Sequence, residues 1–305
     1  MNIEKIIQIK NIPEKELPEF KSLVIEMIKD VLAQREATAS PFNLNLLDRI
    51  IFTSKYDQEL KELSNEQALG IEIGFTDEAY GRGTAKTLLI PKDGDFFQVI
   101  VFDHSHHFQL VHEYTALKRM LSIPEIKEEL KRGASQKVKK LISTDIGPHI
   151  EYTKYIIAHE FGHVHNDSYI IPFFKGESLK QDFLGKEGFL RPIAEVCWSE
   201  YHATLEAAFA VTPHVGEIHL SGFLDTFMEN KNRIDKKILE YRWEMISLDE
   251  LVEYTSNHMG GVLKFCCYLL GWIDGVKECS EGAIKDINDG IRGTYFEKVF
   301  MSSTE

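Results

Sequence analysis

The sequence contains few cysteines, four among 305 residues: Cys197, Cys266, Cys267 and Cys279. None stands in a C-x-x-C pair and two are adjacent, a pattern that disfavours both a disulfide framework and a zinc ribbon. We therefore expect reduced thiols and a cytoplasmic location.

The sequence also lacks a long apolar run. A membrane-spanning helix needs roughly 18 consecutive apolar residues, and the most apolar stretch, residues 260–275, is interrupted by Lys264. That stretch predicts a buried core helix. Charged residues are scattered through residues 1–20, so neither a secretory signal nor a membrane partner is expected.

Lysine and arginine are outnumbered by acidic residues, 35 against 48, which gives a net charge of −13. Such a charge disfavours attraction to nucleic-acid phosphates, and we expect no nucleic-acid partner. The most basic stretch, residues 130–140, is typical of the solvated face of a helix. Hydrophobic residues make up 43% of the chain, enough for the core of one large domain or two modest ones.

The spacing of apolar residues changes along the chain. Residues 14–36 carry apolar side chains at helical spacing. Four short runs rich in β-branched or aromatic residues follow, at 49–54, 70–75, 86–90 and 95–103. Turn residues between the last two predict an antiparallel hairpin.

Beyond residue 105 the pattern is helical almost to the end. A capping-box signal at 122–125 opens one helix, and the Gly147–Pro148 pair leads into another. The sequence therefore predicts an α+β fold, with a small, mainly antiparallel sheet followed by a largely helical C-terminal half.

The helix predicted after Gly147–Pro148 contains the stretch YIIAHEFGHVHND (155–167), which holds a motif with a known mechanism. His159 and His163 are four residues apart, so on a helix they are neighbours, with Cβ atoms about 5 to 6 Å apart. Two imidazoles at that separation can reach one zinc ion at about 2.0 Å each. Glu160 lies a step around the helix, where it can act on a metal-bound water without being a ligand. This is the H-E-x-x-H pattern.

The surrounding residues fit a buried helix with a polar face. An apolar stripe of Ile157, Phe161 and Val164 is separate from a polar stripe of Tyr155, His159, His163 and Asn166. Gly162, unfavourable in a helix by about 1 kcal/mol, lies between the two histidines. His165 points away from the metal face and is expected to pack or to lie at the surface.

A catalytic zinc usually has three protein ligands and one open position. A metzincin would require glycine at 166 and histidine at 169, but the chain has Asn166 and Tyr169. The third ligand is therefore expected on a later helix, residues 191–213, opened by Pro192.

Four polar residues on that helix are candidates: Glu195, Glu200, His202 and Glu206. Three of them share a solvated face with Ser199. Glu200 instead lies in a row of small residues, where a carboxylate is costly unless it is paired or metal-bound. Glu200 is the predicted ligand, and His202 the second choice.

The two motifs HEFGH and EYHAT resemble those of the glutamate-ligand zincins (gluzincins), and the run EYHATLEAAFAVTP is similar to the second motif of ImmA/IrrE-type metallopeptidases. The resemblance covers roughly residues 155–213 and implies a zincin-like fold with zinc bound by His159, His163 and Glu200. Thr204 stands where that family usually has Asp or Asn, and the gap between the motifs is longer. On this basis we expect an N-terminal helical segment (1–45), a catalytic domain (46–213) and a helical C-terminal region (214–305).

The expected function is that of a zinc metallopeptidase, a hydrolase. Zinc would lower the pKa of a bound water to about 7, and Glu160 would act as the general base. Tyr201, His202 and His258 are open candidates for the oxyanion-stabilising group. The expected partner is a protein or peptide substrate, with a restricted intracellular target. The alternative is a zinc-stabilised interaction protein without turnover.

Three further stretches leave alternatives open. The strand at 96–103 precedes the active-site helix and is either an edge strand that pairs with substrate or an interior strand. His104, His106 and His107 could bind a second metal, but a surface loop is favoured because no acid or cysteine cluster accompanies them. Residues 166–191 are either a lid or a packed connection.

Overall fold

The computed structural model describes residues 2–38, 40–66, 84–92, 95–105, 107–124, 135–174, 185–210, 212–276, 289 and 292. The chain divides into two compact units, Met1–Lys180 and Gln181–Glu305. The expected segment limits at 45 and 213 differ from this division and stay predictions.

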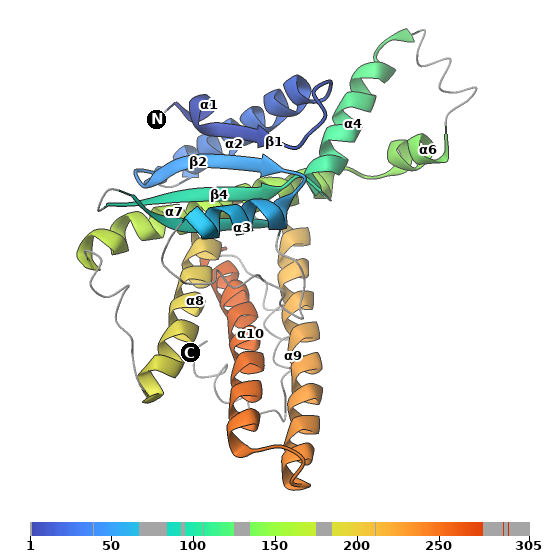
Figure 1. Cartoon of the computed structure of the whole chain (residues 1–305). Helices are drawn as coiled ribbons and strands as arrows, with labels where there is room; N and C mark the ends of the chain where they lie inside the picture. Colours follow the sequence, from blue (N-terminus) through green and yellow to red (C-terminus); the bar gives the residue numbers. More distant parts are fainter. Residues whose placement is uncertain are drawn as a thin grey trace. The chain divides into compact units, whose positions relative to one another are not determined.

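The first unit holds the sheet and most of the shorter helices (Figure 1). Its elements are α1 (Ile3–Ile6), β1 (Ile7–Lys10), α2 (Leu17–Thr38), β2 (Leu47–Thr53), α3 (Tyr56–Glu66), β3 (Ala85–Lys92), β4 (Asp95–Asp103), α4 (His107–Leu121), α6 (Gln136–Ser143) and α7 (Gly147–Phe174). The predicted helix at 14–36 corresponds to α2, and the predicted strands at 49–54, 86–90 and 95–103 correspond to β2, β3 and β4. The predicted strand at 70–75 lies outside the described residues, as does nearly all of the helix expected after 122–125.

The four described strands form a mixed sheet in the order β1-β2-β4-β3. β3 and β4 pair antiparallel, which confirms the hairpin, but β1 pairs parallel to β2 and β2 parallel to β4. The α+β class is confirmed, while the expectation of a mainly antiparallel sheet is wrong. The parallel β2–β4 pair needs a crossover connection, and α3 lies within that connection. β1 was not anticipated, since a strand of four residues gives little periodic signal.

The position of β4 answers one of the open alternatives. It lies between β2 and β3, so it is an interior strand, and the edge-strand alternative for residues 96–103 is wrong. Within the described sheet, β3 forms the edge on this side.

Alternating side chains on β2 and β4 cover both faces of the sheet. On one face, Ile51 and Val101 pack with Leu60 of α3. On the other, the stacked rings of Phe52 and Phe102 are 4.8 Å apart and meet aromatic residues of α2 and α4. The strand period of two thus places α3 on one face of the sheet and α2 and α4 on the other.

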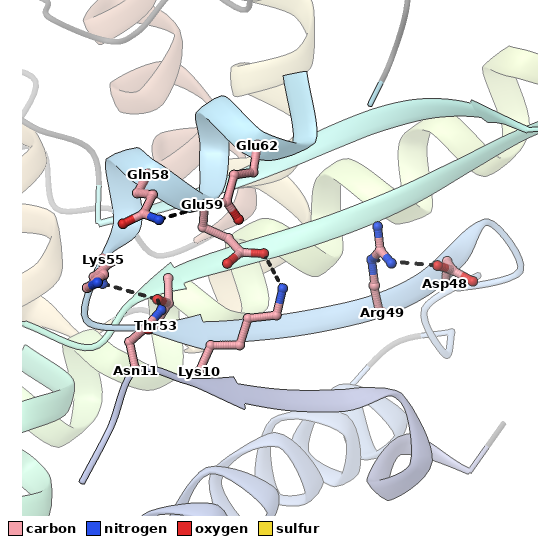
Figure 2. A network of polar contacts seen from close by, with 9 residues as sticks. All are labelled: Lys10, Asn11, Asp48, Arg49, Thr53, Lys55, Gln58, Glu59 and Glu62. Carbon is pink, nitrogen blue, oxygen red and sulfur yellow. Dashed lines mark hydrogen bonds and ion pairs between the residues drawn. The ribbon is translucent and has the colours of Figure 1, made fainter. Parts of the chain in front are cut away.

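Polar contacts fasten the ends of β1 and β2 to α3 (Figure 2). Lys10 at the end of β1 forms an ion pair of 2.5 Å with Glu59 of α3, whose side chain is almost fully buried. Thr53 Oγ1 accepts hydrogen bonds from the Asn11 side chain and from the Lys55 backbone N–H. Because a buried carboxylate is costly unless paired, Lys10 is a structural partner of Glu59.

The second unit is helical in its described part. Its elements are α8 (Gly185–Ala207), the short 3₁₀ helix η2 (Ala208–Ala210), α9 (Pro213–Arg242) and α10 (Leu248–Gly275). α8 begins at Gly185, so the expectation that Pro192 opens this helix is wrong, and the proline lies inside it. α9 and α10 pack through a cluster that includes Phe223, Phe227 and Leu269. The predicted core helix at 260–275 therefore belongs to this interface.

Candidate metal centre

The helix α7 carries the H-E-x-x-H motif in the expected orientation. Ile157, Phe161 and Val164 are fully buried, which confirms the apolar stripe that anchors the helix. His159 is buried and His163 partly buried, and their ring centroids are 4.8 Å apart. The spacing of four residues therefore places the two imidazoles together, as helix geometry requires.

Glu160 is buried and hydrogen-bonded to the neighbouring strand. Its side chain is 5% exposed, and its Oε2 accepts a hydrogen bond of 2.7 Å from the Thr87 hydroxyl of β3. This contact links the motif to the edge strand of the described sheet. No sequence pattern pointed to Thr87, because this hydrogen bond joins residues that are distant in the chain.

His159 and His163 of α7 and Glu200 of α8 form a donor group that could hold a metal ion. Two imidazoles and a carboxylate are a donor set found at catalytic zinc sites. Glu200, rather than His202, is the member contributed by α8 in the part of the chain that the structure describes.

Glu200 has a charged partner within its own unit. Lys264 Nζ of α10 lies 3.4 Å from Glu200 Oε1, and the two side chains are only 16% and 13% exposed. A carboxylate at this position was expected to be paired or metal-bound. Lys264 is one such partner, and a metal ion could be another.

Asp167 lies one turn beyond His163 on α7. Its Oδ2 accepts a hydrogen bond of 2.6 Å from the Gln98 side chain of β4. Burial raises the pKa of Asp167, against the effects of the His163 charge and of hydrogen bonds from Asn166 and Gln98. Carboxylates near metal-binding histidines commonly orient them, and Asp167 was not singled out from the sequence although its spacing from His163 could have indicated it.

His165 lies outside the metal group, as expected. It is buried, and its Nδ1 accepts a hydrogen bond of 2.7 Å from the backbone N–H of Asn43. Its ring also meets those of Phe42 and Tyr169 edge-on. His165 is therefore a packing residue.

The candidates for oxyanion stabilisation have other contacts. The Tyr201 hydroxyl donates a hydrogen bond of 2.6 Å to Asp274, and burial followed by this bond raises the pKa of Tyr201 to about 12. His258 Nδ1 lies 2.6 Å from the side-chain oxygen of Asn230, which is fully buried between α9 and α10. His202 packs against Trp198, and burial lowers the pKa of its imidazole. Tyr201 and His258 are thus each in contact with another polar side chain, and the oxyanion-stabilising role of any of the three residues stays a prediction.

Of the histidines directly after β4, the two that the structure describes, His104 and His107, do not lie in an exposed loop. His104 is buried, with its ring 4.6 Å from that of Phe20 and 6.2 Å from that of His112. Burial, followed by the proximity of His112, lowers the pKa of His104. His107 Nδ1 lies 3.3 Å from His149 Nδ1, and His106 falls outside the described residues. The surface-loop expectation is therefore wrong for His104, which is a core residue.

The chain shows no significant similarity to any protein-family model, curated protein sequence or solved structure. Among the helices that the structure describes, none has the length and apolar character required to cross a membrane.

Proposed function

We propose that the protein is a zinc-dependent peptidase that hydrolyses peptide bonds with metal-activated water. The observation that carries the proposal is the group of His159, His163 and Glu200, with Glu160 adjacent on α7 but outside the group. This arrangement supplies three ligands and one separate carboxylate, as a zinc peptidase requires. The resemblance of HEFGH and EYHAT to the gluzincin motifs supports the same assignment.

The chemistry divides between the ion and the side chains of the chain. A zinc ion would polarise the scissile carbonyl and make water acidic enough to supply hydroxide near neutral pH. Glu160 is the proposed general base, which accepts the proton of the attacking water and passes it to the leaving amine. The Thr87 hydroxyl holds the Glu160 carboxylate through its hydrogen bond. Burial of Glu160 limits competition from bulk water for that contact.

The proposed substrate is a protein or peptide, and we propose an endopeptidase with a restricted target in the cytoplasm. Unrestricted cleavage there would damage other proteins. The cysteine pattern, four residues without a C-x-x-C pair, supports that setting.

The deciding experiment is Glu160→Gln, which keeps the size and hydrogen-bonding capacity of the side chain but removes the base. Purified without chelators, wild type and variant should each contain about one zinc per chain, as a single three-ligand site implies. Peptide cleavage should fall by about 10² to 10⁴, the typical loss for a general base. Glu151→Gln, at an exposed position of the same helix, is the matched control and should cleave like wild type.

Two results would contradict the proposal. Absence of zinc from the wild-type protein would remove the metal centre. If zinc is present, but the wild type cleaves nothing in a broad peptide digest and Glu160→Gln supports the cellular role as well as wild type, the metal is structural. A zinc-stabilised interaction protein would then replace the peptidase.

A further inference from the structure

Helices α8 and α10 pack side by side and run parallel. Residues later in α10 contact residues later in α8. Gly260 lies against Ile193, and Gly271 against Tyr201 and Thr204. A Cβ atom on Gly271 would overlap the backbone oxygen of Tyr201 and lie 3.1 Å from Thr204 Cβ. The two backbones therefore approach more closely than helices separated by ordinary side chains.

Two cysteines face each other inside this register. Cys197 of α8 lies between Ile193 and Tyr201, and Cys267 of α10 lies between Gly260 and Gly271. The register of the two helices brings the thiols close enough to interact, and a hydrogen bond between them shifts the pKa of each. Both are unoxidised and partly exposed, so small molecules can reach them.

The hydrogen bond makes the two sulfurs chemically unequal. The Cys267 thiol donates to the Cys197 sulfur and lowers the pKa of Cys197, against the effect of burial. The same bond, followed by burial, raises the pKa of Cys267. Cys197 is thus the sulfur that more readily becomes the nucleophilic thiolate, and Cys267 is the neighbouring thiol that can complete a disulfide.

We propose that Cys197 and Cys267 are a modification site at which a peroxide forms a reversible intramolecular disulfide between α8 and α10. The Cys197 thiolate attacks one peroxide oxygen, the O–O bond breaks, and Cys197 becomes a sulfenic acid as hydroxide leaves. The hydroxide takes up the proton that Cys197 released and becomes the first water. The Cys267 sulfur then attacks the Cys197 sulfur, the S–S bond forms as the S–O bond breaks, and the departing hydroxyl takes the Cys267 proton and leaves as the second water. Two thiols lose two electrons in total, and hydrogen peroxide is reduced to two waters. A dithiol reductant reverses the reaction.

The site lies beside the charged pair of the candidate metal centre. Glu200 follows Cys197 by one helical turn, and Lys264 precedes Cys267 by one turn. A disulfide with its fixed geometry would change the packing of Cys197 and Cys267 one turn from the Glu200–Lys264 pair. The effect on metal binding rests on the proposed function, whereas the disulfide itself does not.

Peptide mapping of the full-length protein tests the site directly. The reduced protein is treated with a small molar excess of hydrogen peroxide, remaining thiols are blocked with N-ethylmaleimide, and the unreduced digest is analysed by tandem mass spectrometry. The expected product is a peptide pair linked through Cys197 and Cys267, two hydrogens lighter than the reduced pair and absent after dithiothreitol treatment. Cys266→Ser is the matched control, and it should retain this link.

A cross-link from Cys197 to Cys266 or Cys279, or oxidation without any cross-link, would overturn the proposal. Cys267→Ser should abolish the link; if that variant fails to fold by circular dichroism, the wild-type map and the Cys266→Ser map still decide. Zinc affinity of the oxidised protein should be about tenfold weaker than that of the reduced protein, the lower range for disturbed metal surroundings. If reduced protein binds no zinc, the proposed function fails while the peptide map still judges the disulfide.

Discussion

The Thr87 hydroxyl donates a hydrogen bond of 2.7 Å to Glu160 Oε2 and so joins the edge strand β3 to the helix α7. Thr87→Val removes the donor and keeps the shape of the side chain. Hydrogen bonds to charged groups contribute about 1.5 to 3 kcal/mol, so peptide cleavage should fall about tenfold to a hundredfold. Zinc content should not change, since Glu160 is outside the ligand group.

Thr115→Val is the control for that substitution, because the Thr115 hydroxyl donates its hydrogen bond to the Val111 backbone oxygen of its own helix. It should leave cleavage unchanged. Equal loss in both variants would show that Thr87 supports the fold rather than the position of Glu160.

The choice of Glu200 as the third ligand predicts a contrast along α8. Glu200→Ala should weaken zinc binding strongly, because it removes one of three protein ligands. Glu195→Ala should have little effect, since Glu195 is exposed and paired with Arg191. Zinc affinity by competition with a chromogenic chelator provides the measurement. Loss of zinc in His202→Ala with retention in Glu200→Ala would contradict the assignment.

The cysteines of α8 and α10 should differ in their rate of alkylation. The hydrogen bond from Cys267 lowers the pKa of Cys197, whereas burial raises the pKa of Cys266 to about 12. At a pH of about 8, Cys197 therefore holds the larger fraction of thiolate and should react with iodoacetamide at least about tenfold faster. Mass spectrometry of samples quenched at timed intervals measures the alkylation rate of each cysteine.

Alkylation rates measured in Cys267→Ala test whether the hydrogen bond from Cys267 causes the faster reaction of Cys197. Without the donor, the Cys197 pKa should rise and its alkylation should slow. Fastest labelling at Cys266 in the wild type, or unchanged Cys197 labelling in Cys267→Ala, would be inconsistent with the thiol–thiol hydrogen bond.

Gly271 should be sensitive to the smallest added side chain. In Gly271→Ala the methyl group would overlap the Tyr201 backbone oxygen, and overpacking of this kind typically costs about 1 to 3 kcal/mol. In the control Gly222→Ala, the new Cβ would lie 3.5 Å from the Phe265 ring, which is ordinary contact. The free energy of unfolding of Gly222→Ala should be unchanged or higher by up to about 1 kcal/mol, because alanine has the higher helix propensity. Urea denaturation measures the free energy of unfolding of both variants. Similar values for Gly271→Ala and Gly222→Ala would argue against close packing of α8 on α10.

The sequence alone predicted the features that depend on neighbouring residues. Helical periodicity placed Ile157, Phe161 and Val164 on the buried face and His159 beside His163, because a helix fixes which residues share a face. The runs rich in β-branched and aromatic residues at 86–90 and 95–103, with turn residues between them, likewise located β4 and its hairpin with β3. The rank of Glu200 above His202 also came from helical faces, and Glu200 is the residue found in the group that could hold a metal.

Tertiary structure decided what depends on residues far apart in the chain. The parallel β1–β2 and β2–β4 pairs left no local pattern, because strand pairing is selected by packing of the whole sheet rather than by the strand's own residues. The Thr87–Glu160 and Gln98–Asp167 bonds each join α7 to a strand. Cys197 and Cys267 are far apart in the sequence, and the close approach of α8 and α10 at Gly271 belongs to the tertiary structure. Contacts of this kind are set by side-chain volume and backbone approach, which periodicity along one segment does not encode.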